Sequence, residues 1–438
     1  MSQTNPGLQQ PIPPNYRWNS FVFAGDWISF GLALSFVSTS TVLPALVNRL
    51  SGSSLAIGLI STLASGGWLL PQLLAAGRVN RLQRKKPAII VPSLIGRPTF
   101  LISALAILWL AIPNPGLAVA IFLVGYGVFN FCDGIASVPW FDLFSKAIPP
   151  WRRGRFIGAT QVVAAVLAIG VGGIVGYVLG DKSPFQFPTN YAALFLAAAG
   201  FQALSLFFCA NIREIPSPHT DAPSLTARDY LRELKGIWTN DRDFRLITGI
   251  RLLLALTLLA SPFYAVYAIN VKGVPTSTVG LFLSAQIAGG FIYSIVGGYL
   301  LERYGGRLTT NLEAVIALLA PALGIVAGYA LPGDSPWFKV VYLLLFASLG
   351  ALNNSFMMGH MNYLLEMSPE NKRPIYIGLS NTLTGATIVV PLLGGTLVNL
   401  ISYEPLFIVT LLCIAPALTM TVRLSDLRRR AQTTRSAS

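Results

Sequence analysis

Long apolar stretches recur along almost the whole chain and are separated by short polar segments. A helix needs about 20 residues to cross the apolar core of a bilayer. Twelve stretches are long enough, and they lie near 21–48, 54–76, 87–111, 116–142, 156–180, 190–211, 246–271, 276–300, 309–331, 336–366, 374–400 and 403–424. We therefore predict an all-α membrane protein with twelve transmembrane helices.

The scarcity of charge supports this prediction. Charged residues make up 11% of the chain and apolar residues 53%, whereas soluble domains carry about a quarter charged residues. So few charges cannot cover a folded surface in water. The protein is therefore expected to have the lipid bilayer as its main surroundings.

Basic residues alternate with the apolar stretches in a regular way. The N-terminal segment and every second connecting segment after it hold 25 of the 31 Lys and Arg residues, and the other connections hold four. Loops on the cytoplasmic side of membrane proteins are enriched in Lys and Arg. We therefore predict cytoplasmic termini in a multi-pass protein of the cytoplasmic (inner) membrane. The net charge of +14 then reflects topology, and no nucleic-acid partner is expected.

One long polar segment, residues 213–245, interrupts the apolar pattern. It separates six predicted helices from another six and contains several prolines. The predicted organisation is a cytoplasmic tail (1–20), a first six-helix bundle (21–212), a cytoplasmic linker (213–245), a second six-helix bundle (246–424) and a basic cytoplasmic tail (425–438).

An internal repeat supports the division into two bundles. Gly58, Gly67 and Arg81 recur 222 residues later as Gly280, Gly289 and Arg303. Pro149, Arg153, Gly158 and Gln161 recur 220 residues later as Pro369, Arg373, Gly378 and Asn381. The halves are therefore predicted to be parallel repeats related by an axis along the membrane normal.

The loops between helices 2 and 3 and between helices 8 and 9 carry a recurring motif. Residues 298–307 read Gly-Tyr-Leu-Leu-Glu-Arg-Tyr-Gly-Gly-Arg, and residues 76–86 keep the basic run but have Asn80 at the acidic position. The chain resembles the major facilitator superfamily of secondary transporters over residues 20–424. The signature loop of this superfamily consists of a Gly, three residues, an Asp, a basic residue, one residue and a Gly. The resemblance implies transport of a small solute by rocking of two bundles about a central site.

We expect the second signature loop to form a gate that closes the cytoplasmic side in one state. Glu302 and Arg303 would then contact the region of helices 10 and 11. The remaining candidates for this gate are Arg307, Asn80, Arg81, Arg153 and Arg373. Alternatively, these residues form a solvated basic loop that only enforces topology.

Ionisable residues inside apolar stretches are costly, by about 2.5–3.5 kcal/mol at the centre of a helix. Asp26, Asp133, Arg251 and His360 fall on predicted helices 1, 4, 7 and 10, which line the central cavity in the resembled family. We expect them around one cavity, with Asp133 as the protonatable coupling site. The alternative interpretation is that Asp26 and Arg251 are interfacial anchors. His360 would then be an interior hydrogen-bonded group, and Asp133 would stay hydrated near the cytoplasmic interface. Arg97 is expected to pair with a neighbouring helix.

Uncharged polar residues extend this set. Asn130 shares a helical face with Asp133, and Asn353 shares one with His360. Gln161, Gln286 and Asn381 lie within predicted helices 5, 8 and 11. These amides are expected to bind substrate or to link helices.

Several chemistries lack the residues that they need. No phosphate-binding loop is present, two histidines and three isolated cysteines offer no metal site or disulfide, and neither a cofactor nor an enzymatic activity is expected. We predict a monomeric transporter whose partners are the bilayer, a small solute and protons as coupling ion. The alternative is a transport-inactive assembly factor or sensor on the same scaffold. A closed-ended cavity with polar lining at mid-depth distinguishes a transporter.

Overall fold

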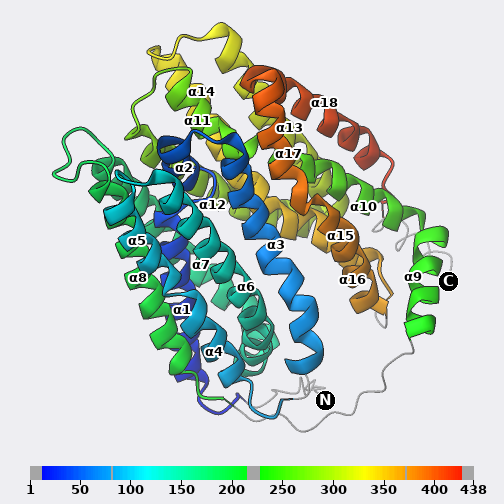
Figure 1. The fold of residues 1–438 in the computed structure, drawn as a ribbon. Helices are drawn as coiled ribbons and strands as arrows, with labels where there is room; N and C mark the ends of the chain where they lie inside the picture. Colours follow the sequence, from blue (N-terminus) through cyan, green and yellow to red (C-terminus); the bar gives the residue numbers. More distant parts are fainter. Residues whose placement is uncertain (1–11, 80–81, 215–226, 370–371, 427–438) are drawn as a thin grey trace, which may run out of the picture.

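The computed structural model describes residues 12–79, 82–214, 227–369 and 372–426. Its helices run back and forth between two ends (Figure 1). Within the described residues, eleven helical segments are long and apolar enough to cross a membrane. The protein is therefore a multi-pass membrane protein. The first helix falls short of the same apolarity because it carries Asn19 and Asp26, so the count of twelve stays a prediction.

The first half of the chain forms eight helical elements. They are α1 (Tyr16–Phe36), α2 (Val42–Ser51), α3 (Ser54–Val79), α4 (Lys86–Gly96), α5 (Thr99–Leu110), α6 (Pro115–Ala147), α7 (Pro150–Val178) and α8 (Thr189–Ala210).

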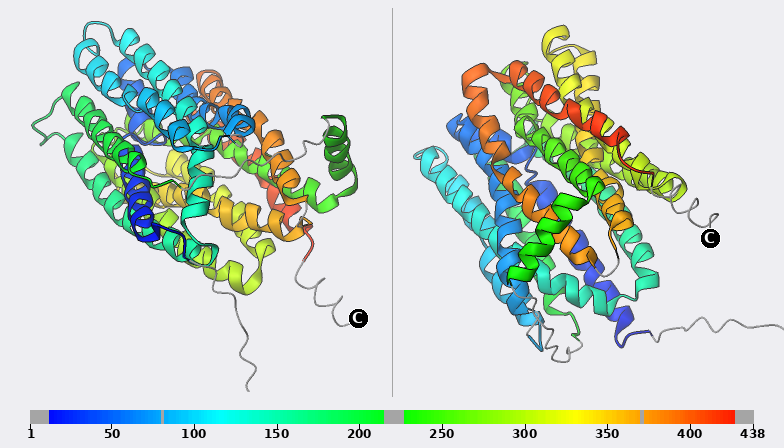
Figure 2. Two further views of the ribbon diagram at one scale, coloured as in Figure 1. Left: turned by 90° about the horizontal axis from the view of Figure 1, so that it is seen from below. Right: turned by 90° about the vertical axis from the view of Figure 1, so that its right-hand side faces the viewer.

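The second half is preceded by an additional helix, α9 (Ala227–Asn240), which lies at the edge of the molecule (Figure 2). The elements that follow are α10 (Arg242–Leu254), α11 (Tyr264–Asn270), α12 (Thr278–Tyr304), α13 (Gly306–Ala330), α14 (Pro336–Phe356), α15 (Asn362–Met367), α16 (Arg373–Thr384), α17 (Val390–Ile401) and α18 (Tyr403–Val422). The segment predicted as a linker thus contains α9 and the start of α10.

The two ends of the molecule differ in charge. We call the end that holds the described residues 82–85, 148–149, 368–369 and 372 the basic end, because basic loops of the sequence lie there. The end with the connections 52–53 and 271–277 is the opposite end. Both α1 and α18 have their outer termini at the basic end, and which side of a membrane this end faces stays a prediction.

The predicted first helix, 21–48, is broken in the structure. It begins earlier, ends at Phe36, and resumes as α2 after the irregular segment 37–41. Pro44 lies in the first turn of α2, where its missing N–H costs no hydrogen bond. The Ser38 carbonyl instead accepts the N–H of Leu43 at 3.0 Å. Hydroxyl side chains in this segment also compete for backbone partners, which favours the break.

The seventh predicted helix is broken at the matching position. Residues 255–263 form 3₁₀ turns between α10 and α11, with Pro262 inside them. Segment 38–41 corresponds to 260–263 at the 222-residue offset of the repeat. The two halves therefore share an interruption as well as a sequence pattern.

Three other predicted helices are also irregular. The third is split at Pro98, the tenth contains the π-helical turn Met357–Met361, and the eleventh contains the 3₁₀ turn Gly385–Val389 before Pro391. Proline removes a helical hydrogen bond and clashes with the preceding turn. Apolar length alone does not predict these interruptions.

The two halves meet along two helix pairs. The most extensive contacts between them join α7 to α12 and α3 to α17. The α7–α12 contact requires glycine, because a Cβ on Gly280 would lie 2.2 Å from the Gly172 carbonyl oxygen. Small residues let helix backbones approach closely in membranes.

Candidate functional site

A pocket of about 710 Å³ lies between the two halves. Its walls come from α1, the break after α1, α6 and α7 of the first half, and from α12 and α14 of the second. Its lining extends from Ser40 and Gln286 to Gly154 and Met358, which lie nearer the basic end. The pocket is therefore reached from the basic end.

The lining is polar but uncharged. No Asp, Glu, Lys, Arg or His occurs among the described residues that line the pocket. The polar lining residues are Ser35, Ser38, Thr39, Ser40, Tyr126, Gln161, Gln286, Ser294, Asn353 and Asn354. Three of the residues predicted from sequence, Gln161, Gln286 and Asn353, are thus brought together here.

The helix break contributes directly to this pocket. Ser40 Oγ donates to Gln286 Oε1 at 2.7 Å, which joins the broken first helix to α12 of the other half. Ser38 Oγ and Ser40 Oγ lie 3.2 Å apart. Discontinuous helices often form the solute sites of membrane transporters.

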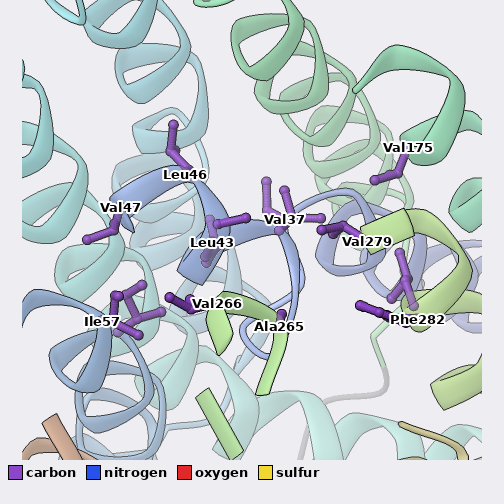
Figure 3. Close-up of a cluster of buried hydrophobic side chains, with 14 of the residues drawn as sticks. Val37, Leu43, Leu46, Val47, Ile57, Val175, Ala265, Val266, Val279 and Phe282 are labelled. Carbon is purple, nitrogen blue, oxygen red and sulfur yellow. The ribbon is translucent and has the colours of Figure 1, made fainter. Parts of the chain in front are cut away.

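Beyond the pocket, towards the opposite end, the interface is closed by apolar packing. Figure 3 shows side chains of α2 and α3 packed among those of α11 and α12. Val37, Leu43, Val266 and Phe282 of this cluster are at most 1% exposed. The apolar layer leaves no continuous polar path from the pocket to the opposite end through these residues.

A pair of asparagines joins the halves outside that layer. Asn48 of α2 and Asn270 of α11 exchange two side-chain hydrogen bonds, each 2.8 Å long. They are 222 residues apart, which is the offset of the internal repeat. The pair therefore joins repeat-equivalent positions of the two halves at the opposite end.

The charged residues of the first half form a separate cluster. Asp26 accepts hydrogen bonds from Trp140 Nε1 at 2.7 Å and from Ser205 Oγ, and Arg97 Nη2 lies 3.8 Å from Asp26 Oδ1. This confirms that Arg97 pairs with a neighbouring helix. Asp26, Arg97 and Asp133 line a second pocket of about 210 Å³ inside this half. Its other walls are largely aromatic, including Trp68.

The second half holds its own cluster. Arg251 donates to Asn381 Oδ1 at 2.9 Å and to Ser380 Oγ at 3.3 Å, and its guanidinium lies over Phe356. His360 Nε2 lies 3.4 Å from Ser380 Oγ. The backbone N–H of His360 donates to Glu313 Oε2, and both side chains are buried.

The structure thus separates the four ionisable residues that the sequence places around one cavity. Asp26 and Asp133 lie in the cluster of the first half, whereas Arg251 and His360 lie in that of the second. None of them lines the central pocket. Asn130 is buried and donates to the Tyr126 carbonyl at 2.7 Å.

The predicted gate residues lie at the basic end. Arg303 donates to Tyr299 OH at 2.7 Å, Arg307 to the Val422 carbonyl at 2.8 Å, and Arg153 to the Ile148 carbonyl at 2.9 Å. Glu302 is exposed at the end of α12, and Arg373 begins α16. Asn80 and Arg81 lie outside the described residues.

Sequence reasoning missed two elements of the site. The first is the hydroxyl-rich break at 38–40, which Pro44 signals within an otherwise apolar run. The second is the pairing of Asn48 with Asn270, which the 222-residue offset relates but which needs the fold to bring together.

Two helical halves with a repeat-related interface and a pocket open at one end define a membrane protein of the transporter class. The sequence profile of the Major Facilitator Superfamily matches residues 27–382. The chain belongs to this family, whose members are transporters.

Individual relatives are distant. An uncharacterized protein of Mycobacterium tuberculosis is 23% identical over 423 residues, which cover 94% of this chain and 77% of the relative. A bacterial homologue of the iron transporter ferroportin is 14% identical in its inward-facing state, with a TM-score of 0.65, and covers 93% of this chain and 98% of its own. Its outward-facing state, covering 93% and 99%, gives a TM-score of 0.56 at 13% identity. The nucleoside transporter NupG is 15% identical over 93% of this chain and 98% of its own, with a TM-score of 0.64.

Proposed function

We propose that this protein is a secondary transporter that carries a small solute by alternating access. The observation that carries the proposal is the pocket of about 710 Å³ between the halves, closed towards one end and open towards the other. Rocking of the halves about this pocket would expose it to each side in turn. The protein would act as a monomer in the cytoplasmic membrane.

The state described here is proposed to be inward-facing. If both termini are cytoplasmic, the basic end faces the cytoplasm and the pocket opens to it. The higher TM-score with the inward-facing than with the outward-facing ferroportin homologue, 0.65 against 0.56, supports this assignment.

The proposed gate belongs to the other state. With the basic end open, Arg303 contacts Tyr299 of its own helix. When the basic end closes, we propose that Glu302 and Arg303 contact the region of α15 and α16. This contact would stabilise the outward-facing state.

Proton coupling is proposed to use Asp133. Asp26 already has two hydrogen-bond donors and a nearby guanidinium. Asp133 lines the same small pocket of the first half and interacts electrostatically with Arg97 and Asp26. A carboxylate beside one cation and one anion can gain or lose a proton when its surroundings change. Arg251, which sequence reasoning placed nearby, lies in the other half.

Cysteine accessibility tests alternating access directly. Gln161→Cys is introduced after Cys132, Cys209 and Cys413 have been replaced by alanine, and a membrane-impermeant thiol reagent is added to right-side-out or inside-out vesicles. We expect labelling from both sides, because the pocket opens to each in turn. Labelling from one side only would support the transport-inactive alternative.

The same vesicles test topology through the exposed Lys235 of α9. Lys235→Cys should be labelled only from the cytoplasmic side. Labelling from the outside would overturn the assignment of the basic end.

Asp133→Asn tests the coupling site. The fraction of molecules with the basic end open is measured by spin-label distances at about pH 5.5 and about pH 8, because a protonatable coupling site makes this fraction depend on pH. We expect the wild type to change with pH and Asp133→Asn to lose most of that change. The control is Asp181→Asn, an exposed residue at the opposite end. An unaltered pH response in Asp133→Asn removes this residue from the mechanism.

A further inference from the structure

We infer that the central pocket selects a neutral solute that carries both hydroxyl or amide groups and an apolar face. This inference rests on the proposed transport function, because it assigns the substrate class of that same pocket. Neutral groups that both donate and accept hydrogen bonds match the lining, whereas ions do not.

The first argument is the absence of a counter-ion. The described lining residues include no charged side chain. A charged solute would leave water without an opposite charge to replace its hydration, which is strongly unfavourable in a low-dielectric site. The pocket therefore selects against both anions and cations.

The charged residues of the two clusters described above are engaged with partners in their own half. Asp26 is paired with Arg97 inside the first half, and Arg251 is held by Ser380 and Asn381 inside the second. These clusters do not reach the described lining of the central pocket. A solute ion would therefore find no partner in these two clusters without breaking contacts within a half.

The second argument is the type of polar group present. Gln161, Gln286, Asn353 and Asn354 contribute carboxamides from both halves. A carboxamide offers a donor and an acceptor in fixed geometry, which matches hydroxyl and amide groups of a neutral solute. The side chains of Gln161 and Asn353 form no hydrogen bond with another described residue, so their amides are available to a solute.

The Gln286 amide is only partly used. Its oxygen accepts the Ser40 hydroxyl, which leaves the amide hydrogens as donors for a solute. A solute hydroxyl bound to the Gln286 amide would lie beside the Ser40–Gln286 hydrogen bond. Within the described pocket, this is the one side-chain hydrogen bond that joins the broken first helix to α12. Solute recognition and the contact between halves therefore share a residue.

The third argument is the apolar part of the lining. Leu283, Ile287, Phe291 and Ile295 follow one face of α12 at helical spacing and line the same pocket. Small-molecule sites typically combine such apolar walls with a few polar groups. An apolar or ring face of the solute would pack on this wall while its polar groups meet the amides.

Matched probes test the inference by adding a charged group to the same neutral parent. The probes are 4-nitrophenyl β-D-glucoside, its glucuronide, which carries a carboxylate, and its 6-amino-6-deoxy analogue, which carries an ammonium group; uridine and uridine 5′-monophosphate form a second set. Binding to the purified full-length protein is measured by thermal shift and titration. We expect at least one neutral parent to bind. Its charged analogues should bind more weakly, by about tenfold or more.

A variant asks whether the pocket itself sets this preference. Asn353→Asp adds one negative charge at nearly constant shape and should shift the preference towards the ammonium analogue by about tenfold. Gln83→Glu is the control, since Gln83 is exposed and lies outside the pocket. It should leave the order of the probes unchanged.

Either of two results overturns the inference. One is a charged analogue that binds as tightly as its neutral parent in the wild type, and the other is failure of both neutral parents to bind at millimolar concentration. The cysteine-accessibility result separates this failure from failure of the transport proposal. If Gln161→Cys still reacts from both sides, transport stands and only the substrate class is wrong.

Discussion

The interface between the two halves differs in residue type and packing between its two ends. At the opposite end, α7 meets α12 through glycines, an apolar cluster follows, and Asn48 pairs with Asn270. Towards the basic end, the same helices α7 and α12 diverge and line a pocket. One interface thus contains a packed part and an open part along the same pair of helices.

This difference indicates which contacts set the free-energy difference between the two conformations. Close backbone packing and the apolar layer stabilise the closed opposite end, while the basic end is open in this state. Weakening the packed end should therefore favour the other state, and control substitutions that leave these contacts intact should not. The following variants test this in order of decreasing effect.

Gly280→Leu should have the largest effect. A Cβ at this position would lie 2.2 Å from the Gly172 carbonyl oxygen and 2.3 Å from the Gly176 nitrogen, so the helices must separate. Overpacking of this kind costs about 3 kcal/mol, and spin-label distances should show the closed opposite end largely lost. Gly173→Leu on α7 serves as the control, because a Cβ at this position would meet nothing within 4 Å. Equal effects of both substitutions would refute the packing argument.

Replacement of the asparagine pair should have an intermediate effect. Asn48→Asp combined with Asn270→Asp removes both hydrogen bonds and places like charges together, which should disfavour the closed opposite end by about 2 kcal/mol. Asn48→Asp with Asn270→Lys should restore most of the closure through an ion pair. Asn114→Asp, which keeps a helix cap at the same end, is the matched control. If the double-Asp and Asp–Lys variants behave alike, the pair does not hold this end closed.

Ser40→Ala should have the smallest effect. It removes the single hydrogen bond to Gln286 across the interface, which is worth about 1 kcal/mol. The ratio of inward-open to outward-open molecules should fall several-fold in the same distance measurement. Ser35→Ala is the control, because Ser35 also lines the pocket but donates to Gly31 within α1. No difference between the two serine variants would show that the bond does not couple the halves.

Much of the fold could be predicted from apolar length, charge distribution and the repeat. The offset of 222 residues that relates Gly58 to Gly280 also relates Asn48 to Asn270. The helix breaks were harder to predict, because residues 37–41 and 255–263 lie inside long apolar runs. The sequence marks them only by Pro44 and Pro262 and by the hydroxyl residues 38–41 of the first break.

The site was predicted less completely. Helix position indicates that Asp133 and Arg251 lie within apolar segments, Asp133 more deeply than Arg251, but the rotation of each helix decides which neighbours they face. Packing turns Asp133 towards the cluster of Arg97 and Asp26 and places Arg251 beside Asn381. The uncharged amides of Gln161, Gln286 and Asn353, by contrast, do meet in one pocket.

Simultaneous distances at both ends test the central claim most directly. Spin labels at positions 83 and 308 report on the basic end, and labels at 51 and 271 report on the opposite end; all four positions are exposed. In a bilayer, alternating access predicts two distances at each end, with the longer basic-end distance populated whenever the shorter opposite-end distance is. Gly280→Leu should lower the population with the shorter opposite-end distance and raise the population with the shorter basic-end distance. A single unchanging distance at each end, or ends that open together, would contradict the account.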